Sequence, residues 1–262
     1  MACIMIDLYD YSLATVFLIG LAVISAASEA GWQLASKGAG RGGDNISTLE
    51  SALLGLLALI IGFTFAMALS RFEARRDAVL NEANAIGTTA LRARLLPEPH
   101  RTATLKLLRE YVQIRLDVVQ SPRSFAEQKP VIDRSNEIQE ALWQTAKVMA
   151  AMDKKMVPTG LFIQTLNEMI DNQGKRLAAL RNRVPNIVFL GLFGIAAVAC
   201  GFVGYAGGRD AKRTRLPVYI MATLVTVVIL LILDLDRPNS GFITTNQQAM
   251  QDAAAAIAAF PD

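Results

Sequence analysis

Four long runs of apolar residues dominate the pattern of hydrophobic and polar positions along the chain. They extend from Tyr11 to Ala27, from Ala52 to Leu69, from Ile187 to Ala206 and from Leu216 to Leu233, and none contains a charged residue. A helix needs about 20 mostly apolar residues to cross roughly 30 Å of hydrocarbon, and uncharged runs enter lipid without an electrostatic penalty. The pattern therefore predicts four transmembrane helices.

The first run lies where a secretory signal peptide would lie. The residues before it include Asp7 and Asp10 but no Lys or Arg, whereas a signal peptide carries positive charge at this place. We therefore expect a retained span. Four spans put both termini, and the long segment between the second and third spans, on one side of the membrane. Six positive residues in the two short loops against eight beside the spans on the other side leave the orientation open.

The long segment between the second and third spans is predicted to be a helical domain outside the membrane. Its apolar residues recur at helical spacing, as at Leu105, Leu108, Val112, Leu116 and Val119. Prolines separate the periodic stretches, and no alternating strand pattern of useful length occurs. The predicted fold class is all-α, a polytopic membrane protein with a helical extramembrane domain between helices 2 and 3.

Four regions follow from this pattern: 1–69 with spans one and two, 70–184 as the helical domain, 185–235 with spans three and four, and 236–262 as a tail. No helix breaker separates Leu69 from about Leu95. The second span is therefore expected to continue into the domain as one helix of roughly 70 Å. The tail is polar and then Ala-rich, which predicts a short docked segment and a weak or frayed helix.

Composition narrows the possible functions. The chain of 262 residues is 53% hydrophobic and 19% charged, with a mean hydropathy of +0.35, and soluble domains usually carry about 25% charged residues. Two cysteines and one histidine argue against a disulfide scaffold or a metal centre. No phosphate-binding loop, nucleophile elbow or paired-histidine zinc motif is present. We expect a membrane protein that is not an enzyme, uses no cofactor and binds no nucleic acid.

Small residues form a stripe along the second span. On an ideal helix, a set of five falls within about 80°: Ser51, Gly55, Ala58, Gly62 and Ala66. Small residues let helix backbones approach closely in lipid. The stripe is therefore interpreted as a packing surface, within the subunit or between subunits, with a glycine hinge as the alternative.

The opposite face of the second span is the candidate pore face. It carries Leu57, Thr64, Ala68, Arg71 and Arg75, followed by Glu82. If the small stripe packs inward, arginines from several subunits would concentrate anions at a pore mouth. Phe63 and Phe65 are the candidates for a hydrophobic constriction.

A structural alternative exists for the same arginines. Arg71 and Arg75 lie where the second span leaves the membrane, and Asp234, Asp236 and Arg237 lie where the fourth span leaves it on the same side. An ion-pair cluster that joins the two helix ends would explain these residues without conduction. Both roles are compatible with the sequence.

Two separated motifs resemble a known family. The first is residues 62–76 (GFTFAMALSRFEARR), which continue through 81–87 (NEANAIG) to Pro97, and the second is 233–238 (LDLDRP), followed by Gly241. Together they resemble the bestrophin-like family of bacterial four-span membrane proteins over almost the whole chain. Bestrophins are oligomeric anion channels with cytosolic helical domains.

The resemblance implies a homo-oligomeric ion channel, possibly anion-selective, that conducts passively in the bacterial inner (cell) membrane with its helical domain in the cytoplasm. Its partners would be the lipid bilayer, further copies of the chain and inorganic anions. The alternative is a membrane-tethered scaffold or sensor whose helical domain binds a protein partner. A secondary transporter is disfavoured because no charge or paired broken helix marks a substrate site within the membrane.

Overall fold

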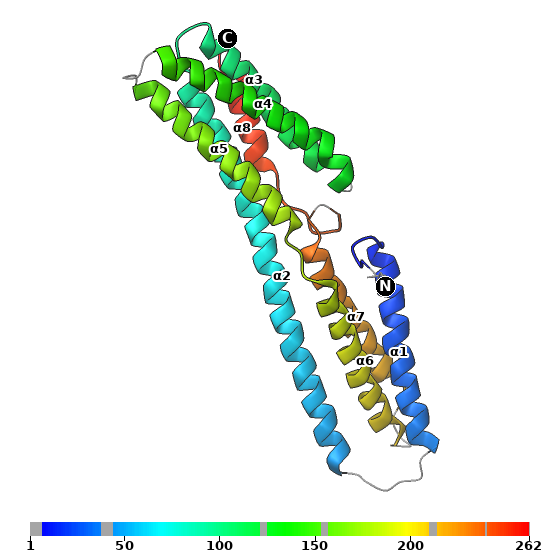
Figure 1. The fold of residues 1–262 in the computed structure, drawn as a ribbon. Helices are drawn as coiled ribbons and strands as arrows, with labels where there is room; N and C mark the ends of the chain where they lie inside the picture. Colours follow the sequence, from blue (N-terminus) through cyan, green and yellow to red (C-terminus); the bar gives the residue numbers. More distant parts are fainter. Residues whose placement is uncertain are drawn as a thin grey trace, which may run out of the picture. The chain divides into compact units, whose positions relative to one another are not determined.

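The computed structural model describes residues 7–37, 44–120, 125–152, 157–209, 214–238 and 240–261. These residues form helices and no strand (Figure 1), which confirms the all-α prediction. The helices are α1 (Leu13–Lys37), α2 (Asp44–Ala93), α3 (His100–Gln120), α4 (Phe125–Met152), α5 (Val157–Arg181), α6 (Asn186–Gly208), α7 (Leu216–Asp236) and α8 (Gln248–Ala258).

Four helices are long and apolar enough to cross a membrane, namely α1, α2, α6 and α7. The prediction of four spans is therefore confirmed. Helix α2 has 50 residues without a break, a length of about 75 Å at 1.5 Å per residue. It extends well beyond Leu69, as expected from the absence of breakers there. The predicted break at Ser121-Pro122 lies outside the described residues.

The chain divides into two compact units. The first, here the membrane unit, contains residues 1–71 and 183–243, and the second, here the helical unit, contains residues 72–182 and 244–262. Helix α2 contributes to both units, since its residues to Arg71 belong to the first and those from Phe72 to the second. The tail is divided as well, because residues 236–243 belong to the membrane unit.

Close helix packing characterises the membrane unit. Helix α1 packs along α6 and also contacts α7, and α6 packs on α7. At Gly31 of α1 and Gly204 of α6 the facing helix backbone lies where a Cβ atom would stand, so neither position accepts a side chain without a shift. Glycine thus permits the backbone approach that strengthens packing between helices in lipid.

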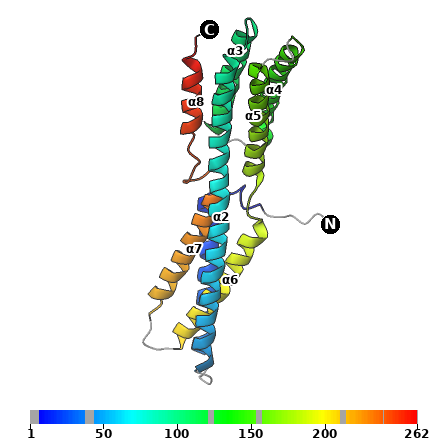
Figure 2. The same cartoon turned by 90° about the vertical axis from the view of Figure 1, so that its left-hand side faces the viewer.

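Helix α3 is central in the helical unit, since it packs on both α4 and α8, while α4 packs on α5. Both views show α8 beside α3 (Figures 1 and 2). The predicted stripe residues Leu105, Leu108 and Val112 are buried in the core. Helix α8 lies in the tail where a weak or frayed helix was expected, and that expectation is wrong, because its packing through Met250, Ala254 and Ile257 stabilises it. A helix of 11 residues would be only marginally stable without such packing.

Candidate functional site

The intramembrane part of α2 has one buried face and one exposed face. Leu57, Thr64 and Ala68 are buried in the single chain, and the Thr64 hydroxyl donates a hydrogen bond to the carbonyl of Ile60 at 2.7 Å. The face expected to line a pore is thus the face that the chain itself covers. The premise that the small-residue stripe packs inward within the subunit is wrong for Gly55 and Gly62, where a Cβ atom would meet nothing within 4 Å.

The exposed face of α2 carries the larger apolar side chains. Phe63 is 65% exposed, Leu59 54% and Leu56 45%. On an ideal helix these three residues fall within about 60° of one another. Phe65 is 37% exposed and points about 160° away from Phe63. The two candidate constriction residues therefore lie on different sides of the helix and cannot line the same surface.

A network of polar contacts ties the end of α7 to the rest of the membrane unit. The carboxylate of Asp234 accepts hydrogen bonds from the backbone N–H groups of Phe242 and Ile243, each at 3.0 Å. The Asp236 carboxylate accepts one from the backbone N–H of Val184 at 2.8 Å and another from the Tyr9 hydroxyl. The two aspartates therefore hold backbone that precedes α6 and follows α7.

Arg237 fastens the segment before α1 to the same place. Its Nη2 donates to the carbonyl of Leu8 at 3.0 Å and to the carbonyl of Tyr11 at 2.7 Å. Arg71 is half-buried and donates to the carbonyl of Met67 at 3.3 Å, whereas Arg75 is buried. The partners described for the aspartates are backbone amides and a phenol, and the pairing of Arg71 and Arg75 with them stays a prediction.

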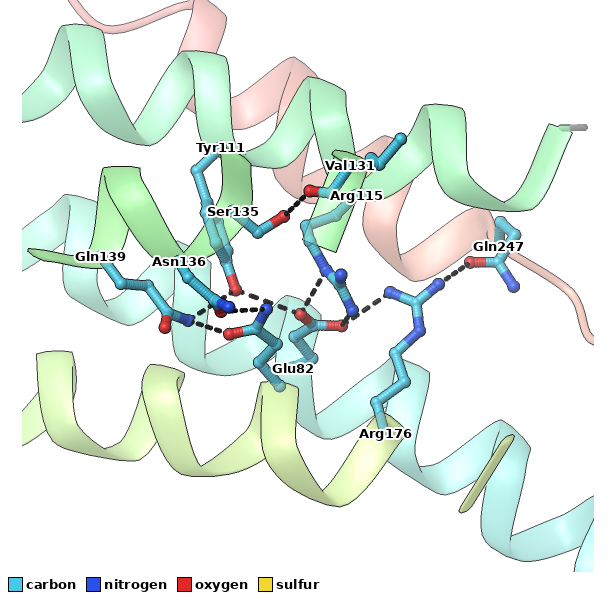
Figure 3. A network of polar contacts seen from close by, with 10 residues as sticks. Glu82, Tyr111, Arg115, Val131, Ser135, Asn136, Gln139, Arg176 and Gln247 are labelled. Atoms are coloured by element: carbon cyan, nitrogen blue, oxygen red, sulfur yellow. Dashed lines mark hydrogen bonds and ion pairs between the residues drawn. The ribbon is translucent and has the colours of Figure 1, made fainter. Parts of the chain in front are cut away.

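A buried charge cluster lies in the helical unit. Figure 3 shows Glu82 of α2 between Arg115 of α3 and Arg176 of α5. Arg115 Nε donates to Glu82 Oε1 at 2.7 Å, and Arg176 Nη1 donates to Glu82 Oε2 at 2.6 Å. The side chains of Glu82 and Arg115 are completely buried. Two guanidinium groups thus share one carboxylate in the interior.

Uncharged polar side chains extend this cluster. The Tyr111 hydroxyl donates to Glu82 Oε1 at 3.3 Å and accepts from Gln139 Nε2 at 3.1 Å, while Arg176 Nη2 donates to Gln247 Oε1 at 3.2 Å. Burial, and after it the charge of Glu82, raises the pKa of the Tyr111 phenol, so this group stays neutral. Burial acts to raise the pKa of Glu82, but Arg115 and Arg176 together hold it below its usual value.

Sequence reasoning placed Glu82 on a helix face but missed both of its partners. A signal was present, because Arg115 and Arg176 each interrupt a buried stripe. Arg115 follows Leu108 by seven residues, and Arg176 follows Met169 by seven, so each shares a helix face with a core residue. A charged residue on such a face is rarely buried without a partner. Which partner it finds depends on the tertiary fold.

The chain is similar to one family of membrane proteins. Residues 46–250 match the model of the bestrophin-like domain. A crystal structure of a bacterial bestrophin homologue from Klebsiella pneumoniae aligns with a TM-score of 0.68 and 16% identity over 94% of this chain and 97% of that one. A crystal structure of a substituted membrane protein aligns with a TM-score of 0.69, the same identity and the same coverage. At this identity the structural likeness concerns the fold alone. No curated protein matches the sequence.

Proposed function

The chain belongs to the bestrophin-like family, and we propose that several copies of it assemble into a membrane channel that conducts anions passively. The observation that carries the proposal is the uncovered apolar face of α2 within a membrane unit whose other helices pack on one another. The likeness to bestrophins, which are oligomeric anion channels, supplies the class of function.

The exposed face of α2 suits the lining of a central axis. Six exposed residues fall within about 80° on the helix, namely Ala52, Leu56, Leu59, Phe63, Ala66 and Ser70. Gly55 and Gly62 lie on the flank of this face, where they would let the α2 helices of neighbouring copies approach closely. In this arrangement Leu57, Thr64 and Ala68 hold the helix against its own subunit.

Phe63 forms the constriction in this proposal. It is the most exposed large side chain on the face, and a ring of apolar side chains can close a pore by excluding water. Arg71 follows about two turns further along the helix and about 80° around it from Phe63, beyond the last apolar residue of the span. Positive charge from several copies there would attract anions beside the pore mouth. Arg75 is buried and is therefore less suited to that role.

Planar-bilayer recording of the purified full-length protein under a chloride gradient tests the proposal. Wild type should give discrete currents that reverse near the chloride equilibrium potential. Phe63→Ala should raise the single-channel conductance, because it removes the ring that narrows the pore. Phe65→Ala is the matched control, since it makes the same change on the other side of the same helix and should leave conductance unchanged.

The outcomes separate the proposal from its rivals. An effect of Phe65→Ala on the conductance without an effect of Phe63→Ala would show that the proposal places the pore on the wrong face of α2. Electrical silence from protein shown to be folded and oligomeric would favour the alternative, a membrane-tethered scaffold or sensor. A monomer at membrane concentrations would exclude the channel, because four spans are too few to enclose a roomy pore.

We further propose that the protein lies in the inner membrane with the helical unit in the cytoplasm, as the likeness to bestrophins suggests. Residues 244–262 belong to the helical unit, so a protein fused after residue 262 reports the location of that unit. A green fluorescent protein fusion should fluoresce and an alkaline phosphatase fusion should be inactive. The reverse result would place the helical unit in the periplasm.

A further inference from the structure

A pocket opens at one end of the helical unit, away from the charge cluster of Glu82. Its volume is about 400 Å³, which lies within the usual range of small-molecule sites. The last turn of α2 and the residues that follow it, the first turns of α3, and the segment after α8 form its walls. The lining residues are Leu91, Arg94, Leu95, Arg101, Leu105 and Pro261.

The wall formed by the segment after α8 is held in place by two arginines. Arg109 Nη2 donates to the carbonyl of Phe260 at 2.6 Å, and Arg109 Nε donates to the carbonyl of Ile257 at 3.4 Å. The Arg94 guanidinium lies over the Phe260 ring, 4.7 Å from its centroid. The pocket is therefore built by contacts between segments that are far apart in the sequence.

The pocket combines an apolar floor with a cationic rim. Leu105 is buried, and Leu91 and Leu95 are about half exposed. Arg94 is stacked on Phe260, which leaves the N–H groups along its edge without a protein partner among the described residues. A stacked guanidinium is already oriented, and its edge matches the two oxygens of a carboxylate.

Among the residues that the structure describes, one carboxylate lies beside this rim. Arg101 Nη2 contacts Glu98 Oε1 at 2.5 Å, and both side chains are a little under half exposed. Glu98 also accepts hydrogen bonds from the hydroxyl and the backbone N–H of Thr102, at 3.1 and 3.3 Å. Within the described part of the chain, Arg94, Arg101 and Glu98 leave a local excess of one positive charge. An anion with an apolar body would satisfy both the excess charge and the leucine floor.

We propose that this pocket binds an amphiphilic carboxylate, a molecule with an apolar chain and a carboxylate head. Arg94 binds the carboxylate head, with Arg101 as the second cation. The apolar chain packs against Leu91, Leu95 and Leu105. Every residue in the site belongs to the helical unit, so octanoate binding can be measured whether or not the protein conducts.

Calorimetric titration of octanoate into the full-length protein in discs of neutral lipid tests this site, with empty discs subtracted. Wild type should bind octanoate saturably and should bind neither acetate, which lacks the chain, nor octyltrimethylammonium, which has the opposite charge. Arg94→Gln should weaken octanoate binding by about tenfold or more, because it removes a charge-assisted pair. Leu95→Gln should weaken it by removing part of the floor.

Lys106→Gln is the matched control, because Lys106 is an exposed cation on α3 that does not line the pocket. It should leave octanoate binding unchanged, and the helical content of every variant should equal that of wild type by circular dichroism. Equal binding of octanoate to wild type and Arg94→Gln would overturn the proposal. So would acetate binding as tight as that of octanoate, or the absence of saturable binding to wild type.

Discussion

Glu82→Gln should destabilise the helical unit strongly. The substitution keeps the size of the side chain and removes the only carboxylate that contacts Arg115 and Arg176 among the described residues. Both guanidinium groups are buried, and Arg115 Nη1 already has no hydrogen-bond partner in the described part of the chain. Without Glu82, two buried positive charges would face each other with no anion between them.

The expected loss of unfolding free energy is about 3–5 kcal/mol. This is the range found when one partner of a buried ion pair is removed and the other stays buried. For a unit of this size it corresponds to a fall of roughly 10–20 °C in the unfolding midpoint. The matched control is Glu137→Gln, which makes the same change in an ion pair with Arg134 whose side chains are at least half exposed. Exposed pairs contribute only about 0–1 kcal/mol.

Tryptophan fluorescence isolates the helical unit in this experiment. The chain has two tryptophans; Trp143 packs against the core of the helical unit, whereas Trp32 lies in the membrane unit. In a Trp32→Phe background, urea unfolding followed at Trp143 therefore reports on the unit that contains Glu82. Adding Arg176→Gln to Glu82→Gln should recover part of the loss, because it removes one of the two unpaired charges.

The pH dependence gives an independent check. Because the folded-state pKa of Glu82 is held below its ordinary value of 4.5, its contribution is fully present above that value and declines as the pH falls toward the folded-state pKa. Glu82→Gln has no such contribution to lose, so the difference between wild type and variant should shrink on acidification below about pH 4.5. A loss under 1 kcal/mol at pH 7, or a difference independent of pH, would refute the reasoning.

Three further predictions concern the membrane unit. Gly204→Ala should lower the temperature at which the detergent-solubilised protein aggregates, because the added methyl meets the backbone of Ser28. Gly191→Ala on the same helix meets nothing within 4 Å and should leave that temperature unchanged. Size-exclusion chromatography after heating measures both. Tyr9→Phe should cost about 1–3 kcal/mol by removing a hydrogen bond to the Asp236 carboxylate, visible as faster proteolysis before α1. Arg71→Glu should move the reversal potential away from the chloride value, and an unchanged potential would remove Arg71 from the conduction path.

The spans and the helical domain were predictable because their signals are local. A run such as 52–69 must cross the membrane whatever it packs against, and the spacing of Leu105, Leu108 and Val112 defines a buried face of α3 in water. The inward face of α2 was not predictable in the same way. Lipid is as apolar as a protein interior, so Leu57 and Leu59 look equivalent in the sequence, although one is buried and the other exposed.

The contacts of the helical unit were unpredictable for another reason. Glu82 and Arg176 are 94 residues apart and Glu82 and Arg115 are 33 apart, so only the packing of α2, α3 and α5 decides that they meet. The same holds for the pocket, where Pro261 lies beside residues of α2 and α3. Helix periodicity places each charged residue on a face, but it carries no information about which face of another helix lies opposite.

The glycines of the membrane unit add a second argument that α2 has a partner outside its own chain. An exposed leucine costs nothing in lipid, so the exposed face of α2 is considered together with its glycines. A glycine within a helix, by contrast, costs roughly 0.5–1 kcal/mol relative to alanine. Gly204 offsets this cost through its close contact with α1, whereas Gly55 and Gly62 of α2, like Gly191 and Gly194 of α6, face open space in the single chain. On the exposed flank of α2, the assembly proposed above would supply a contact for Gly55 and Gly62, since a neighbouring α2 approaches most closely where no side chain intervenes.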